Sequence, residues 1–342
     1  MANKAIILSI RGKFAVWPMI IAALLAGCIR SADRGQSDAA PHRFRVALLT
    51  PGPVSDAGWN ASAYNGLKLI EKELEAETAQ VQTGSPADFE DAFRDFGARG
   101  FDLVFAHGFE YSDVALAVGR DFPRTVFVVT SGSGASANVA SLAFRIEDAT
   151  YVEGVLAGGL TKTGVVGEIG GIEIPQIKIT FEAFRRGFLS VRPDGRVLLT
   201  YTGSFDDVGA AKEAALAEVS QKADVLFHNT DAAGLGVFEA AAQARVMAFG
   251  INRDQSEVAP DWVVASAIAD IPGAFLKVAR EVRAGRFRAR MIEYGMRDGM
   301  VRVVYNPKLR DRIPSAALAR ASQAEHAIIA GQVAIASHGP PR

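Results

Sequence analysis

The 342-residue chain has one cysteine, Cys28, and a formal net charge of only −1. A single thiol excludes a disulfide within the chain, so a hydrophobic core must hold the fold together, and 49% hydrophobic residues can supply one at this length. The near-zero net charge lacks the excess of Lys and Arg that contact with nucleic-acid phosphates requires. We therefore expect a globular protein of two lobes or domains with no nucleic-acid partner.

Long apolar runs are also absent. The longest one near the amino end covers residues 14–26, whereas a membrane-spanning helix needs about twenty apolar residues. This run follows Lys4, Arg11 and Lys13 and ends in small residues, which is the pattern of a secretory signal. Residues 1–27 are therefore predicted to be a signal peptide.

The end of this run, Leu25-Ala26-Gly27-Cys28, resembles the bacterial lipobox. The resemblance implies cleavage before Cys28 and lipid attachment to its sulfur. The protein would then be extracytoplasmic and anchored to the cell membrane by the lipid, at the periplasmic face in a Gram-negative cell. The polar residues 28–43 would form a flexible tether. The alternative is an uncleaved or ordinary signal in which Cys28 is incidental.

Beyond the tether, strand-like runs rich in Val, Ile and Phe alternate with helix-period segments. Such continuous apolar runs are typical of parallel strands buried on both faces. The helical segment 147–160 separates two series of runs, so the pattern predicts two doubly wound α/β lobes. The expected strands are 45–50, 80–83, 102–106, 125–130 and 139–144, then 165–169, 197–201, 224–228, 246–250 and 263–268.

Polar and aromatic residues follow these strands. In open α/β sheets, ligands bind beyond the carboxyl ends of the strands. Two such rims facing each other would enclose a polar cleft with aromatic walls. The sequence has no phosphate loop, nucleophile elbow or His-Glu zinc motif, so we expect binding rather than catalysis, with no catalytic residue, cofactor or metal site.

The segments 56–60, 161–167, 203–207 and 250–255 occur in the order of the motifs of the basic membrane protein family, the ABC-transporter substrate-binding lipoproteins that include bacterial purine-nucleoside receptors. The chain resembles this family from about residue 45 to 335. The resemblance implies the type I periplasmic binding protein fold, in which two α/β lobes are joined by a three-strand hinge and close around a ligand.

The resemblance also implies how the chain is divided between the lobes. The first lobe would contain residues 44–145 and about 269–290, and the second would contain residues 146–268 and about 291–335. Residues 336–342 would be a frayed tail.

The family pattern assigns ligand-binding roles residue by residue. Trp59 stands where the family has a Phe that packs on the base. Asn60 would offer the ligand a donor and an acceptor, Phe205 would form the opposite wall, and Asp113 matches an acidic position of the first lobe. With polar residues and a glycine near other strand ends, the expected ligand-binding set is Asp56, Trp59, Asn60, His107, Asp113, Phe205, Asp231, Gly234, Asn252 and Asp270.

Structural roles are open for several of these residues. Trp59 and Phe205 would also fit a buried core. Asp231 and Asp270, like the neighbouring pair 206–207, would also serve as helix N-caps. The strand-ending His107 and His228 lack a second His at metal spacing, which favours a structural role for each.

Three positions depart from the family pattern. The family commonly has Asp where this chain has Thr50 and Asn252, and Lys where it has Ala269. In the nucleoside binders the Asp and Lys hold the sugar or base, so these changes put the ribose contacts in doubt.

The resemblance predicts a solute-binding lipoprotein that takes a purine nucleoside or nucleobase and delivers it to an ABC permease in the membrane. One alternative is a ligand sensor of the same fold that signals to a membrane receptor. Another is a lipoprotein enzyme that acts on a similar ligand.

Overall fold

The computed structural model describes residues 43–56, 58–333 and 335. The predicted signal peptide, Cys28, nearly all of the tether and the tail 336–342 lie outside these residues. Within the described part, no helix has the length and apolar character needed to cross a membrane.

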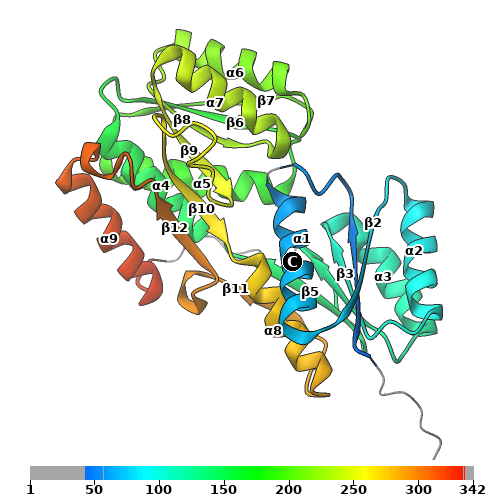
Figure 1. Cartoon of the computed structure of the whole chain (residues 1–342). Coiled ribbons are helices and arrows are strands. Elements are labelled where there is room, and N and C mark those ends of the chain that lie inside the picture. The colour runs from blue at the N-terminus through cyan, green and yellow to red at the C-terminus, as the bar shows by residue number, and fades with distance from the viewer. Residues whose placement is uncertain (1–42, 57, 334, 336–342) are drawn as a thin grey trace, which may run out of the picture. The chain divides into compact units, whose positions relative to one another are not determined.

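Lobe 1 is built on a six-stranded parallel sheet in the order β11-β5-β4-β3-β1-β2. Alternate apolar side chains of the central strands are buried on opposite faces, against α2 and α3 on one side and against α1 and α8 on the other (Figure 1). The strands are β1 (Arg45–Thr50), β2 (Glu77–Gln82), β3 (Leu103–His107), β4 (Val126–Thr130), β5 (Val139–Phe144) and β11 (Met291–Tyr294). The helices are α1 (Trp59–Leu74), α2 (Pro86–Ala98), α3 (Ser112–Val118) and α8 (Ile271–Arg283).

Lobe 2 repeats this plan in the order β12-β10-β9-β8-β6-β7, with only β12 antiparallel to its neighbour. Helices α6 and α7 cover one face, and α4 and α5 cover the other. The strands are β6 (Val165–Gly170), β7 (Arg196–Tyr201), β8 (Val225–Asn229), β9 (Met247–Asn252), β10 (Val263–Ala269) and β12 (Val301–Tyr305). The helices are α4 (Glu147–Leu160), α5 (Pro175–Val191), α6 (Val208–Ser220), α7 (Gly234–Ala244) and α9 (Ser315–Ile329), of which α9 packs on α4.

Both sheets share one winding order. The second strand of each lobe lies outside the first, and the third lies on the other side of the first. The winding direction therefore reverses between β1 and β3 in lobe 1 and between β6 and β8 in lobe 2. The prediction of two doubly wound lobes is confirmed, and ligands of such sheets bind where the order reverses.

The chain crosses between the lobes three times. It passes from β5 to α4, from β10 to α8, and from β11 to β12. Because β11 pairs with β5, lobe 1 extends through this strand, a few residues beyond the expected boundary at about residue 290. This strand is short and alternates exposed and buried residues, so it lacks the continuous apolar run that marks the other strands.

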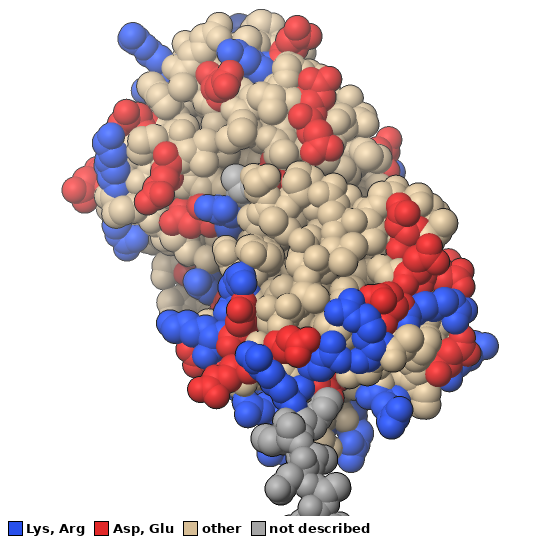
Figure 2. Space-filling model, turned by 45° about the vertical axis from the view of Figure 1, so that its right-hand side comes forward, with Lys and Arg blue, Asp and Glu red and all other residues tan. Residues whose placement is uncertain are grey.

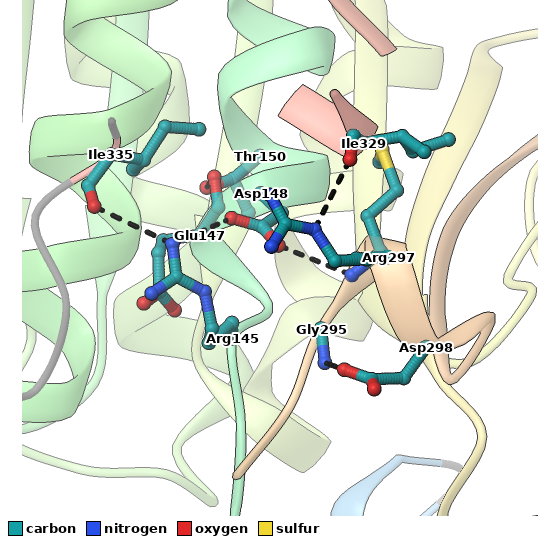
Figure 3. A network of polar contacts seen from close by, with 10 residues as sticks. Arg145, Glu147, Asp148, Thr150, Gly295, Arg297, Asp298, Ile329 and Ile335 are labelled. Carbon is teal, nitrogen blue, oxygen red and sulfur yellow. Dashed lines mark hydrogen bonds and ion pairs between the residues drawn. The ribbon is translucent and has the colours of Figure 1, made fainter. Parts of the chain in front are cut away.

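A polar network links two of these crossings at the hinge (Figure 3). Asp148 at the start of α4 accepts hydrogen bonds from Met296 N (3.1 Å) and from the Arg145 guanidinium (3.2 Å). The same guanidinium reaches the carbonyl oxygen of Ile335 at 3.5 Å. Beside it, Glu147 is fully buried, and neither of its carboxyl oxygens has a hydrogen-bond partner in the part of the chain that the structure describes. Burial raises its pKa to about 7.

Candidate ligand-binding site

A cavity of about 280 Å³ lies where the winding order of both sheets reverses. Lobe 1 contributes the loops after β1 and β3, and lobe 2 contributes the loops after β6 and β8, with further residues from the remaining strand ends. This volume and mixed lining suit one small molecule. The lining residues are Pro51, Gly52, Pro53, Asp56, Trp59, Asn60, Gly108, Phe109, Glu110, Ser131, Phe144, Ile146, Ile174, Gln176, Ile177, Thr180, Phe205, Asp206, Asn229, Asp231, Asn252 and Ala269.

Asp56 organises the wall formed by the amino end of α1. Its Oδ1 accepts from the backbone N–H groups of Gly58 (3.0 Å) and Ala61 (2.9 Å), and its Oδ2 accepts from Asn60 N (2.7 Å) and Asn60 Nδ2 (2.9 Å). The carboxylate therefore satisfies N–H groups that a helix start would otherwise leave unpaired. Its main role is to hold Asn60 and the preceding turn in place.

The indole of Trp59 is supported from behind by His107. The two rings stack with centroids 4.1 Å apart, and His107 Nε2 lies 3.1 Å from the Trp59 carbonyl oxygen. Because a carbonyl only accepts, Nε2 carries the hydrogen, and Nδ1 accepts from the Thr130 hydroxyl (2.8 Å). Burial lowers the pKa of His107 to about 3, so the ring is a neutral support.

Two amide oxygens at the cavity wall have no hydrogen-bond partner within the described residues. Asn60 Oδ1 is one, because the Nδ2 of the same side chain is held by Asp56. Gln176 Oε1, at the start of α5, is the other. A buried unpaired acceptor is costly, so both oxygens are suited to receive N–H or O–H groups of a ligand.

Phe205 and α5 form much of the lobe 2 wall. The Phe205 ring lies so close to Gly171 that a Cβ there would be 2.3 Å from its Cδ1. Below it, Asn229 donates to the Thr180 hydroxyl (3.1 Å), which ties the end of β8 to α5. These contacts fix an aromatic face and polar groups on the same side of the cavity.

Three lining residues have a positive φ, which is uncommon for residues other than glycine. Ser131, Asp231 and Asn252 have φ values of 56°, 52° and 70°, respectively. The other non-glycine residues with positive φ in the described part, Glu75, Lys222 and Arg245, lie at helix ends, where this conformation is ordinary. Strain at three strand ends around one cavity points to a functional site.

A buried chain of polar side chains links two of these strained positions. Gln255 Oε1 accepts from Ile251 N (2.9 Å) and from His228 Nε2 (3.2 Å), and His228 Nδ1 pairs with the Thr230 hydroxyl (3.1 Å). Burial lowers the pKa of His228 to about 4, so it is also neutral at pH 7. This brace holds the backbone next to Asn252 and Asp231.

The cavity wall is acidic. It includes four carboxyl groups, from Asp56, Glu110, Asp206 and Asp231, and no Lys, Arg or His among the described lining residues. Burial raises the pKa of Glu110. No group of three or more His, Cys, Asp or Glu in the described part of the chain could hold a metal ion. By contrast, charges of both signs are mixed on the outer face in Figure 2.

Six of the ten residues predicted to bind ligand line this cavity: Asp56, Trp59, Asn60, Phe205, Asp231 and Asn252. Their contact with a ligand remains a prediction. The other four, His107, Asp113, Gly234 and Asp270, lie outside the lining.

Each of these four has a different place. His107 lies behind Trp59, and Gly234 packs on His228, where a Cβ would be 2.3 Å from the ring. Asp113 is exposed on α3, because the loop residues Phe109 and Glu110 precede it at the strand end. Asp270 caps α8 by accepting from Gly273 N (3.0 Å). His107 and His228 support different walls and do not pair with each other.

The family model described as "ABC transporter substrate-binding protein PnrA-like" matches residues 44–337. The chain belongs to this Bmp family. It is 28% identical over 275 residues to basic membrane protein A of Borreliella burgdorferi (78% of this chain, 80% of the relative). It is 27% identical over 267 residues to a purine-binding protein of Brucella abortus (77% of this chain, 76% of the relative).

A solved structure of an ABC transporter solute-binding protein from Conexibacter woesei has 25% identity and a TM-score of 0.73, covering 86% of this chain and 98% of that one. The type I periplasmic binding protein fold is thereby confirmed. As a Bmp-family protein, the chain is an extracytoplasmic substrate-binding protein of an ABC transporter, with a small-molecule ligand and a membrane permease as its partners.

Of the three positions that depart from the Bmp pattern, two line the cavity and one is buried outside its lining. Thr50 is fully buried, donates to Gly52 O (2.9 Å) and accepts from Gln80 (3.0 Å), so it fixes the loop and does not line the cavity. Asn252 and Ala269 both line it. A wall that would carry a charge pair in the family pattern therefore carries an amide and a methyl group here.

Sequence reasoning missed the contribution of α5. Ile174, Gln176, Ile177 and Thr180 line the cavity from the loop after β6 and the first two turns of the helix. The signal was present in the strand order: β6 is the first strand of lobe 2, so its carboxyl end adjoins the point where the order reverses.

Proposed function

We propose that this Bmp-family protein binds an uncharged purine, either the nucleobase or the nucleoside, and delivers it to its ABC permease from a lipid anchor at Cys28. The observation that carries the proposal is the composition of the cavity wall. Trp59, Phe109, Phe144 and Phe205 offer faces on which a planar ring can pack, and Asn60 and Gln176 offer unpaired acceptors for its N–H groups.

The charges of the wall restrict the ligand further. Four carboxyl groups without a facing base disfavour phosphate, because the anion would be desolvated beside like charge. The purine-binding protein of Brucella abortus supports the same ligand class. We therefore expect nucleobases and nucleosides to bind and nucleotides to be rejected.

Isothermal titration calorimetry of the full chain with adenine, hypoxanthine, adenosine, inosine and AMP tests this proposal. At least one of the first four should bind, and AMP should not. Trp59→Ala should weaken binding by about 5- to 150-fold, since stacking on a base is worth roughly 1–3 kcal/mol. Asp113→Asn, outside the cavity, should leave the affinity unchanged.

Two results would contradict the proposal. If none of the two nucleobases and two nucleosides binds, or if AMP binds, the expected ligand class is wrong. If Trp59→Ala folds and binds as the wild type does, the indole face is not part of the site.

A further inference from the structure

Away from the hinge, a hydrogen bond joins the two lobes directly across the cavity. Trp59 N, at the first residue of α1 in lobe 1, donates to Asp231 Oδ1 in lobe 2 over 3.1 Å. Asp231 follows β8, which is separated by β9 from β10, the strand that leads into a crossing. Because hinge opening separates the rims of the lobes, it would break this bond.

The contact is built from both sides. On lobe 1, a Cβ on Gly58 would lie 2.6 Å from Asp231 Oδ1, so only glycine lets the carboxyl approach. On lobe 2, the left-handed backbone of Asp231 (φ 52°) places its side chain, and the neighbouring Thr230 is held by His228. A strained backbone at Asp231 and a close approach at Gly58, on opposite sides of one contact, indicate that the contact is functional.

Two carboxyl groups from different lobes thus share the first turn of α1. Asp56 takes the N–H groups of Gly58, Asn60 and Ala61, and Asp231 takes the N–H of Trp59 between them. A helix amino terminus favours one nearby negative charge, but two carboxylates at one site repel each other.

No Lys or Arg among the described residues that line the cavity relieves this repulsion. The other acidic side chain that acts on Asp231 is Asp206, in the exposed loop before α6. The nearest imidazoles, His107 behind Trp59 and His228 behind Thr230, are buried and neutral. Protonation of Asp231 therefore removes the repulsion, because it leaves Asp56 as the one charged carboxylate at this helix terminus.

We propose that Asp231 is a proton-controlled latch, which holds lobe 2 on the amino end of α1 when its carboxyl is protonated and releases it when the carboxyl is ionised. This latch regulates the site proposed above and rests on that proposal for the identity of its ligand. The carbonyl oxygen of the protonated group still accepts from Trp59 N, and the ionised group faces Asp56.

The direction of the pH effect follows from linkage. Burial first, and then Asp56, raise the pKa of Asp231 to about 7 in the closed form. In the open form the carboxyl returns to water, where the ordinary value is about 4. The closed form holds the proton more tightly, so the resulting preference for closure is full below about pH 4 and is lost as the pH rises from about 4 to about 7.

The latch can be tested without a ligand by measuring the distance between the lobes. The full chain would carry Cys28→Ser, so that only engineered thiols react with the spin label. The labelled positions would be Asp91→Cys on α2 and Glu213→Cys on α6, both of which are exposed. Double electron–electron resonance at pH 5.5 and 8.5 should show the short-distance population rising at the lower pH. An unchanged distribution would overturn the proposal.

Variants on both lobes identify the responsible group. Asp231→Asn keeps an oxygen for Trp59 N without a charge, so its closed population should be high and equal at both pH values. Gly58→Ala displaces the carboxyl from the other lobe and should open the protein at both. Asp113→Asn and the hinge variant Glu147→Gln should keep the wild-type pH response. A pH response that persists in Asp231→Asn and Gly58→Ala, or vanishes in Glu147→Gln, would refute the latch.

Titration with adenosine then separates the two proposals. We expect the affinity of the wild type to fall about tenfold from pH 5.5 to 8.5 and that of Asp231→Asn to stay constant. Adenosine, adenine, hypoxanthine and inosine failing to bind while the distances respond to pH would reject the purine ligand and keep the latch. Binding that is independent of pH in the wild type would reject the latch and keep the ligand.

Discussion

At the scale of single residues, the hinge contains a carboxyl group that has no hydrogen-bond partner among the described residues. Glu147 is 0% exposed, both of its oxygens are unpaired, and burial raises its pKa to about 7. In the unfolded chain the ordinary value is about 4.3. The folded state therefore binds this proton more tightly, and its contribution to stability is lost as the pH rises from about 4 to 7.

Glu147→Gln should consequently stabilise the protein at pH 8 and have little effect at pH 5. The expected gain at pH 8 is roughly 1–3 kcal/mol, because the amide removes a buried unpaired charge. Urea unfolding at both pH values measures this change in the free energy of unfolding. The control is Glu257→Gln, which makes the same change of charge at an exposed position. Equal effects of Glu147→Gln at pH 5 and pH 8 would show that the carboxyl does not titrate in this range.

From the sequence, cavity residues that directly follow strands could be predicted. Residues whose position depends on how a following helix begins could not. Trp59, Asn60 and Asn252 were placed at the cavity because strand ends share one edge of a sheet. Gln176 was missed because its place depends on how α5 begins after β6. Asp113 was misplaced because a short 3-10 turn after β3 brings Glu110 to the cavity and leaves α3 outside.

At the scale of elements, the closest helix contact in lobe 2 is between α4 and α5. A Cβ on Gly154 would lie 1.9 Å from Phe184 O and 2.8 Å from Phe188 N. Both atoms belong to the backbone of α5, which cannot move aside as a side chain could. Gly154→Ala must therefore separate two helices that support the cavity and the hinge.

We expect Gly154→Ala to destabilise the protein by about 1–3 kcal/mol through overpacking. The control is Gly209→Ala near the start of α6, where the nearest atom is Asp207 Oδ1 at 3.4 Å and the residue is exposed. There alanine should add up to about 1 kcal/mol of stability through helix propensity. Thermal unfolding of both variants checks the pair, and a neutral Gly154→Ala would contradict the close packing.

The elements that the sequence predicts well are those whose burial is continuous. The ten expected strands are all present, and the helix 147–160 has the expected bounds. Helix α1 ends at Leu74, because Glu75 adopts the left-handed conformation (φ 50°) and β2 begins at Glu77. The short strands β11 and β12 were not expected, because pairing with the hinge-side strands defines them more than their own composition does.

At the scale of the whole molecule, three crossings and one contact across the cavity govern how the lobes move. The hinge network around Asp148 is made of backbone and side-chain bonds near the crossings, which a rotation can preserve. The Asp231–Trp59 bond joins the loops after β1 and β8, which are not the strands next to the crossings, so a rotation that parts the lobes breaks it. Control of closure therefore belongs to the rim, and the hinge provides the constant connection.

The proposed lipid anchor extends this argument to the place where the receptor works. Delivery to a permease is faster if the binding protein stays at the membrane, and lipid on Cys28 would confine it there through the tether 28–43. In the native host, Cys28→Ser should abolish a lipid-modified amino-terminal peptide in mass spectrometry and shift the protein from the membrane to the soluble fraction or leave the signal uncleaved. Adenosine affinity should be unchanged, because the cavity is formed wholly by the folded part after residue 43. A wild-type peptide without lipid at Cys28 would show instead that the cysteine is incidental and that the receptor diffuses freely.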